Sequence, residues 1–367
     1  MRHNVRSQLK QAGLGIIEIM VAITIGLLIL AGVVQLYASS SSTQLSQEGN
    51  SRIQENLRFL MASIEEDFNV TGYAGCFPLG ANDPESPQRI DNKLGFQANP
   101  AQPFNFNNYV DGFNDTGPGS NPSGSDRVVI RFASYASKIP VVSPMANTGT
   151  VNDQLVGPFQ IDTMHPAYSL LRQYQVVILS DCTRATIFMI TNDPQMSGGF
   201  IEHVTGMVAP AGSLNPNQFN VDDEFLRNYG ELTGSTPAFL YAGSTGYHEY
   251  DLNVSAVGNA AGGACIAATP EYCALFRDGI ELVEGVEDFQ VEYGYKQPVL
   301  VRPGYSENTG DLIYCDASTC PNMTWVDRVK ITVTINSVQP APTNTGTQLI
   351  KRTFSRVINI RNKLPMG

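Results

Sequence analysis

Residues 13–37 read GLGIIEIMVAITIGLLILAGVVQLY, an apolar run that carries one acid, Glu18, close to its beginning. The 24 residues from Leu14 to Tyr37 would form a helix about 36 Å long, enough to cross the roughly 30 Å hydrocarbon core of a bilayer. Only basic charges precede the run, and this bias keeps the amino end in the cytoplasm and exports the rest. The sequence therefore predicts a single membrane-spanning segment followed by a large exported body.

Two simpler interpretations of this segment stay open. A secretory signal peptide has the same basic start, and small residues at 38–42 would suit its cleavage, but its apolar region is usually about 7 to 15 residues long and lacks an acid. A plain signal anchor explains the span but not the glutamate. A lone charge inside lipid costs about 2.5 to 3.5 kcal/mol at the bilayer centre, so Glu18 is expected to have a partner.

The register of Gly13, Leu14 and Glu18 resembles the class III leader of type IV pilins and pseudopilins. The resemblance implies that a prepilin peptidase removes the leader, residues 1–13, and methylates the new amine of Leu14. It further implies that Glu18 pairs with such an amine on a neighbouring subunit, where attraction in a low dielectric offsets the desolvation of both charges.

The helix is expected to continue from its transmembrane half, residues 14–38, into an amphipathic half, residues 39–70. Apolar residues recur there every three or four positions, which marks one helix face that should lie on a sheet. They are Ile53, Leu57, Leu60, Ile64 and Phe68. Gly49 is expected to be a weak point, and the glycines within 72–75 should end the helix.

Residues 71–367 predict a β-rich periplasmic head, and hence an α+β fold in which the long helix packs on one enlarged antiparallel sheet. Short β-branched runs bounded by turn residues predict the strands. The runs are 126–133, 174–180, 184–191, 200–208, 289–295, 329–335 and, after a loop at 337–346, 348–361. Residues 78–125, rich in Asn, Pro, Gly and Asp, predict an irregular insertion.

Six cysteines in an exported chain predict three disulfides. The two pairs that are close in sequence leave a third, long-range pair, although six cysteines allow many other pairings. The expected pairs are Cys265–Cys273, Cys315–Cys320 and Cys76–Cys182. A zinc site made by the four later cysteines is the metal alternative, but their spacing is not C-x2-C, so we expect no metal and no cofactor.

Acidic residues outnumber basic ones, with 34 Asp and Glu against 23 Lys and Arg. The net charge is -11, and it becomes -14 without residues 1–13, which argues against nucleic acid as a main partner. Residues 321–367 are the exception, with seven basic residues against one acid. We expect this basic sheet face to meet acids of the same head, such as Glu65, Glu66 and Asp67, and a docking patch is the alternative.

Catalytic motifs are absent from the sequence: there is no GxSxG, Walker loop, HExxH or CxxC. The histidines at 165, 203 and 248 are isolated, which favours structural or solvated roles over metal ligation. Tyrosines at 241, 247 and 250 could form a sugar platform, but aromatic residues on strands are more often core. We therefore predict a protein that is not an enzyme.

Five further stretches, in this order, resemble the PilW family of minor pilins. They are GYAGC at 72–76, LSDC at 179–182, LVEGVEDFQVEYGY at 282–295, WVDRVKITVTI at 325–335 and VINIRN at 357–362. The resemblance implies a structural subunit that takes part in type IV pilus assembly and initiation near the pilus tip, after residence in the inner membrane. The implied partners are prepilin peptidase, other minor pilins, the major pilin and a large tip adhesin.

Two alternatives to this function stay open. PilW-like proteins also resemble the J-type minor pseudopilins of type II secretion, which are the nearest alternative. From another class, a tip adhesin would bind a surface or glycan through residues 78–125.

Overall fold

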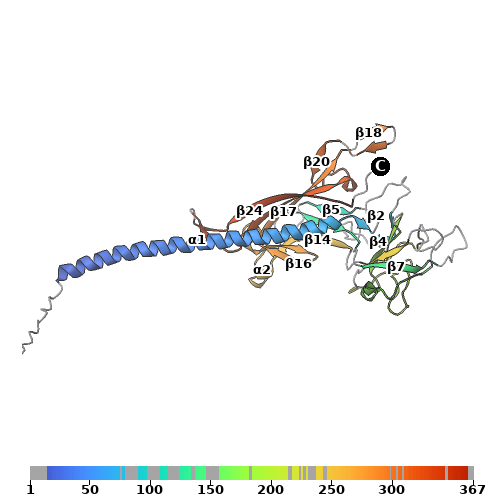
Figure 1. The fold of residues 1–367 in the computed structure, drawn as a ribbon, viewed down its shortest axis with the longest axis horizontal. Helices are drawn as coiled ribbons and strands as arrows, with labels where there is room; N and C mark the ends of the chain where they lie inside the picture. The colour runs from blue at the N-terminus through green and yellow to red at the C-terminus, as the bar shows by residue number, and fades with distance from the viewer. Residues whose placement is uncertain are drawn as a thin grey trace, which may run out of the picture.

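The computed structural model describes one long helix and a strand-rich head, an α+β arrangement (Figure 1). The described residues are 15–74, 77–78, 90–96, 108–114, 124–133, 137–145, 157–181, 184–213, 217–222, 225, 229, 237–242, 246–297, 299–302, 305–307, 310–343 and 346–362.

Helix α1 runs without a break over Ile16–Val70, 55 residues or about 80 Å. Its first half projects away from the head, and its second half lies along the head (Figure 1). The helix ends where the sequence predicts, because Gly72 takes a positive φ of 78° that other residues rarely adopt. Gly49 does not interrupt the helix. A side chain there would stand 3.2 Å from both Ile350 Cδ1 and Ser337 Cβ, so glycine allows the head to approach closely.

Three larger sheets build the head, and the strands of each are named in their spatial order. The seven-stranded sheet contains β11 (Phe200–Ile201), β8 (Phe159–Ile161), β7 (Lys138–Ser143), β13 (Phe239–Tyr241), β9 (Val176–Ser180), β10 (Ala185–Met189) and β3 (Ile90–Asn92). The five-stranded sheet contains β16 (Ile280–Glu284), β15 (Cys273–Arg277), β14 (Tyr247–Val254), β6 (Arg127–Arg131) and β5 (Val110–Phe113). The four-stranded sheet contains β20 (Leu312–Cys315), β17 (Val286–Lys296), β21 (Arg328–Asn336) and β24 (Lys351–Asn359).

Smaller elements connect these sheets. Four two-stranded ribbons pair β1 (Tyr73–Ala74) with β2 (Phe77–Pro78), β12 (Gln218–Asn220) with β4 (Leu94–Phe96), β18 (Val299–Arg302) with β19 (Tyr305–Glu307), and β22 (Ala341–Thr343) with β23 (Gly346–Gln348). The short helices are η3 (Pro166–Leu170), α2 (Ala256–Ala260), η4 (Pro270–Tyr272) and η5 (Met323–Trp325).

Two hydrophobic cores hold the head together. The first joins the amphipathic half of α1 to the five- and four-stranded sheets, and the second fills the outer side of the seven-stranded sheet. Strands β9 and β10 lie between the two cores, and all ten of their residues are buried. In β21 the alternation that the sequence predicts is present, with Val329, Ile331, Val333 and Ile335 fully buried.

The expected single antiparallel sheet is wrong in two respects. The head contains several sheets, and β3 pairs in parallel with β10. Residues 78–125 are not wholly irregular either, because they supply β3, β4 and β5. Strands of three or four residues are too short to show a period of two, so the expectation for this segment rests on composition alone.

Two further expectations need correction. The run 200–208 forms only the two-residue strand β11, and the loop at 337–346 contains most of the β22–β23 hairpin. In β5, position 112 requires glycine, because the ring of Tyr293 occupies the space that a side chain would need.

Asp251 of β14 is expected to make the stability of the chain depend on pH. Burial raises its pKa to about 6, with a further contribution from Glu249, whereas Arg127 opposes the shift. Between about pH 4 and pH 6 the folded state therefore keeps a proton that the unfolded state loses, so stability falls as the pH rises.

We expect Asp251→Asn to stabilise the chain more at pH 7 than at pH 4.5, since asparagine carries no charge to bury. Urea denaturation at both values measures this. Asn253→Ala on the same strand is the control and should shift stability equally at both values. An equal shift for Asp251→Asn would contradict the interpretation.

Candidate functional site on the long helix

Every residue of α1 from 16 to 41 is exposed in the isolated chain. Leu27, Leu28, Ile29 and Leu30 are consecutive, so they point to all sides of the helix, and each is at least 57% exposed. A helix that is apolar all round is stable only inside a membrane or among other apolar elements. This segment is long and apolar enough to span a membrane. We call residues 16–41 the exposed half of α1.

Glu18 lies in the first turn of this exposed half. Its backbone N–H donates to the carbonyl of Gly15 at 3.0 Å, and its side chain is exposed. Within the described part of the chain, no hydrogen bond or ion pair engages its carboxylate. A negative charge is favourable at a helix N-terminus, although this alone does not offset burial in lipid. Gly13 and Leu14, which precede it, lie outside the described residues.

The amphipathic half of α1 packs against the head through the predicted face. Ile53, Leu60, Ile64 and Phe68 have no exposed surface, and Leu57 is partly buried against the same core. At about 1.5 to 3 kcal/mol for each large side chain, this face is the main hydrophobic attachment of the helix.

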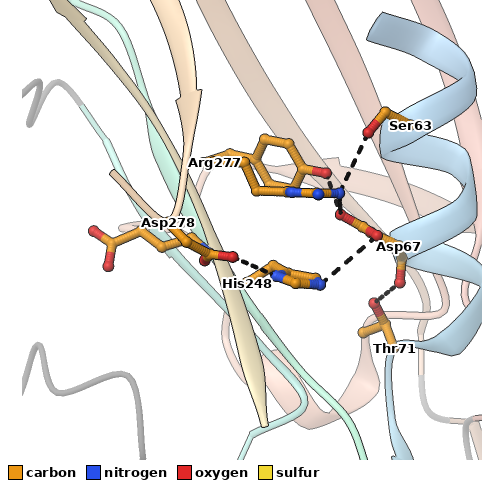
Figure 2. A network of polar contacts seen from close by, with 8 residues as sticks. Ser63, Asp67, Thr71, His248, Arg277 and Asp278 are labelled. Carbon is orange, nitrogen blue, oxygen red and sulfur yellow. Dashed lines mark hydrogen bonds and ion pairs between the residues drawn. The ribbon is translucent and has the colours of Figure 1, made fainter. Parts of the chain in front are cut away.

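A buried carboxylate, Asp67, fixes the last turns of α1 to the head (Figure 2). The hydroxyl of Tyr250 and Nη1 of Arg277 both donate to its Oδ2, the latter at 3.0 Å. Arg277 also reaches Ser63 one turn earlier, at 3.4 Å. Because Asp67 is only 7% exposed and Tyr250 is fully buried, both need these partners. We call Asp67, Tyr250 and Arg277 the anchor.

The pKa values of the anchor follow from this arrangement. Burial raises the pKa of Tyr250, and the carboxylate of Asp67 raises it further, so the phenol stays a donor. Partial burial acts to lower the pKa of Arg277, but Asp67 and Tyr250 outweigh that effect and raise it. Over the physiological pH range the phenol of Tyr250 is therefore neutral and the guanidinium of Arg277 is charged.

His248 extends the network to a second carboxylate (Figure 2). Its Nδ1 is 2.6 Å from Oδ2 of Asp278, and its Nε2 is 3.8 Å from Oδ1 of Asp67. The ring also lies 4.9 Å from that of Phe132. Oδ1 of Asp278 accepts the backbone N–H of Glu249, so the carboxylate holds the imidazole beside the anchor. The histidine has the structural role that the sequence predicts.

The basic end of the chain meets acids of the same head, as expected, although mostly different ones. Arg356 pairs with Glu65 of α1 at 2.6 Å. Lys330 and Lys351 pair instead with glutamates of β17, and Asp67 pairs with Arg277, which lies outside 321–367. The pairs of Arg356, Lys330 and Lys351 are partly exposed, so each contributes little to stability, unlike the buried pair of Asp67 with Arg277.

The structure contains the two short-range disulfides that the sequence predicts, Cys265–Cys273 and Cys315–Cys320. Cys76 and Cys182 lie outside the described residues, so the long-range pair stays a prediction.

The remaining candidate residues serve the core or cap secondary structure. Tyr241 and Tyr250 are buried, as the core interpretation requires. His203 is buried against the ring of Phe225, and His165 accepts the N–H of Ala167 at the start of η3. In the described ranges, no three His, Cys, Asp or Glu side chains come together as a metal site would require.

The anchor as a unit has no signal in the sequence. In the sequence, Asp67 is one of three consecutive acids near the end of the helix. Tyr250 and Arg277 are more than 180 residues away from it in the chain. A buried acid on the apolar face of a helix is the one available sign, since such a charge needs a partner.

Comparisons with protein-family models, with curated proteins and with solved structures find no match to this chain.

Proposed function

We propose that the chain is a minor type IV pilin of PilW type, a structural subunit that takes part in pilus assembly. The observation that carries the proposal is the exposed half of α1, which is apolar on all sides and continuous with a helix that is anchored to the head. Such a segment suits two environments in turn, a bilayer before assembly and a bundle of like helices afterwards. The register of Gly13, Leu14 and Glu18 supports the same function.

In this proposal the head stands in the periplasm while the exposed half of α1 spans the inner membrane. Assembly moves that half into the bundle, where the amine of a neighbouring subunit neutralises Glu18. Because α1 is continuous, the place of its exposed half in the bundle then fixes where the head lies. Asp67 and the apolar face of α1 keep the two parts in one orientation.

The size of the head favours a place near the pilus tip. The described strands of the head extend sideways from α1 as well as beyond its C-terminal end (Figure 1). Closely spaced inner helices leave little lateral room, so many adjacent copies would collide. A subunit of this shape fits at an end of the fibre, where it has fewer neighbours, and acts when the fibre begins.

Removing the protein should cut the number of pili, because initiation becomes slow, and blocking pilus disassembly at the same time should restore many of them. Counting pili by microscopy in both backgrounds tests this, with restoration of the intact gene as the control. A copy number near that of the major pilin would contradict it. Full numbers of pili that lack only adhesion would favour a tip adhesin, and lost protein secretion with normal pili would favour a J-type pseudopilin.

Replacing Gly13 with a bulky residue, as in Gly13→Phe, should leave residues 1–13 attached, because the peptidase must accommodate a small residue at the cut. The span should still insert, since the change leaves residues 16–41 intact. Mass analysis of the mature amino terminus measures the outcome, and Gly26→Ala is the control that should be processed normally. A wild-type chain that starts near Ser39 would indicate an ordinary signal peptide.

A further inference from the structure

Strand β24 is the longest open edge of the described sheets. It ends the four-stranded sheet and pairs on one side only, with β21. Its nine residues keep an unbroken register, without Gly, Pro or a bulge. The other edge strands of the larger sheets, β20, β16, β5, β11 and β3, have five residues or fewer. In Figure 1, β24 follows the margin of the head beside α1.

The hydrogen-bond register shows which backbone groups of β24 face outward. Ile360 N–H donates to the carbonyl of Asp327, and at the other end Ser337 N–H donates to the carbonyl of Ile350. Even-numbered residues therefore bond to β21 throughout, and odd-numbered residues turn their N–H and C=O groups to the open edge. The outward residues are Lys351, Thr353, Ser355, Val357 and Asn359.

The side chains of β24 give this edge a positive character. Lys351, Arg352 and Arg356 are its charged residues, and none of the nine is acidic. Lys351 and Arg356 have ion-pair partners in the same head but remain about half exposed, at 49% and 47%. Among the residues that the structure describes, Arg352 reaches only the amide oxygen of Asn50, at 3.4 Å. An acidic strand would therefore find accessible cations here, mainly on the side that faces α1.

We propose that β24 is a docking edge that adds an extended, acidic segment of another protein subunit as a further strand of the four-stranded sheet. The outward N–H and C=O groups supply affinity, and the basic side chains select acidic partners. A second copy of β24 is a poor occupant, because each copy would bring three basic residues and no acid to the shared edge. The identification of the occupant as a pilus subunit rests on the proposed function.

The competing view is that the basic residues only protect the edge from aggregation. Charged side chains are one protective device, but the others, a short strand, a bulge or a proline, are all absent from β24. A single substitution separates the two views. Ser355→Pro removes an outward N–H and leaves the bonds to β21 in place, because residue 355 does not bond to β21. Ser355→Ala is its matched control, since both variants lose the contact of the Ser355 hydroxyl with Thr332.

The test uses the full-length chain purified in detergent and a labelled peptide that alternates glutamate with valine. We expect saturable binding that weakens as salt is raised, and slower amide exchange over residues 351–359 in the bound state. Ser355→Pro should weaken binding about tenfold, the factor for one backbone hydrogen bond, and Ser355→Ala less than about twofold. Equal binding of a peptide with lysine in place of glutamate, or equal binding by both variants, would overturn the proposal.

Charge exchange provides a second readout in case Ser355→Pro fails to fold. Arg352→Glu should weaken binding of the glutamate peptide and strengthen that of the lysine peptide, and the absence of both effects would count against the proposal. In cells, a photo-crosslinker in place of Val357, which is 47% exposed, should capture an acidic segment of another subunit. Capture of a second copy instead would overturn the choice of occupant.

These readouts separate this inference from the proposed function, because peptide binding requires no pilus. Lost peptide binding with the expected pilus counts would contradict the docking edge alone. Intact peptide binding with unaltered pilus counts in the deletion strain would contradict the pilin function alone.

Discussion

Replacing Asp67 by alanine is expected to lower the free energy of unfolding by about 3 kcal/mol. The change leaves the buried hydroxyl of Tyr250 and the guanidinium of Arg277 without their acceptor. The value lies at the low end for a broken buried pair, because the Arg277 side chain is 36% exposed and water replaces part of the lost contact. Urea denaturation, followed by the fluorescence of the single tryptophan, measures the change.

Two further variants show whether the loss comes from the anchor. Asp67→Asn keeps an oxygen acceptor but removes the charge, so it should cost about half as much. Glu66→Ala changes the exposed residue just before Asp67. Its free energy of unfolding should stay within about 0.5 kcal/mol of that of the unchanged chain. If Asp67→Ala behaved like Glu66→Ala, the apolar face alone would hold the helix. Amide exchange over residues 60–70 should rise in Asp67→Ala, rise less in Asp67→Asn and stay unchanged in Glu66→Ala.

The long elements of this fold were predictable from sequence because their periodicity extends over many residues. Helix α1 has an apolar half and then an apolar stripe, and both patterns continue for several turns. Strand β21 alternates partly exposed and buried residues from Arg328 to Ile335, and β17 does so from Phe289 to Tyr293. Each pattern fixes the type of element and the face that it buries.

The division into several sheets could not be predicted in the same way. β3 is three residues long, and its partner β10 lies about 95 positions later in the chain. Nothing local in residues 90–92 specifies that pairing, because the stabilising contacts come from a strand that is itself buried on both faces. Short strands in this head are a consequence of tertiary packing, and propensity carries little information about them.

The candidate site shows the same division between local and distant signals. Glu18 stands out in sequence because one acid interrupts an apolar run. Asp67 is less conspicuous, since neighbouring acids at 65 and 66 make it look like part of a solvated charge cluster. Only its helical position, three residues after Ile64 and next to Phe68, places it on the buried face. Its partners come from β14 and β15, which the sequence does not connect to the helix.

Replacing Glu18 by alanine should leave membrane insertion intact and reduce the amount of the chain recovered with other pilus subunits about tenfold or more. Insertion is preserved because removing a charge from an apolar helix lowers the cost of placing it in lipid. Assembly suffers because the substitution removes the carboxylate that attracts the amine of a neighbouring subunit. That carboxylate has no partner within the described chain. Membrane fractionation measures the first effect, and co-purification with quantitative mass spectrometry measures the second.

The Glu18 result also bears on where the subunit stands in the fibre. If a subunit precedes this one, its amine is the partner of Glu18, and the chain lies just below the apex. At the apex no such amine exists, so Glu18→Leu would then be harmless and pilus numbers would not change. Glu48→Ala is the control, because Glu48 is exposed on the same helix but lies outside the apolar run. Normal recovery with Glu48→Ala and loss with both Glu18 variants would place the subunit below the apex, whereas normal recovery with Glu18→Leu would place it at the apex.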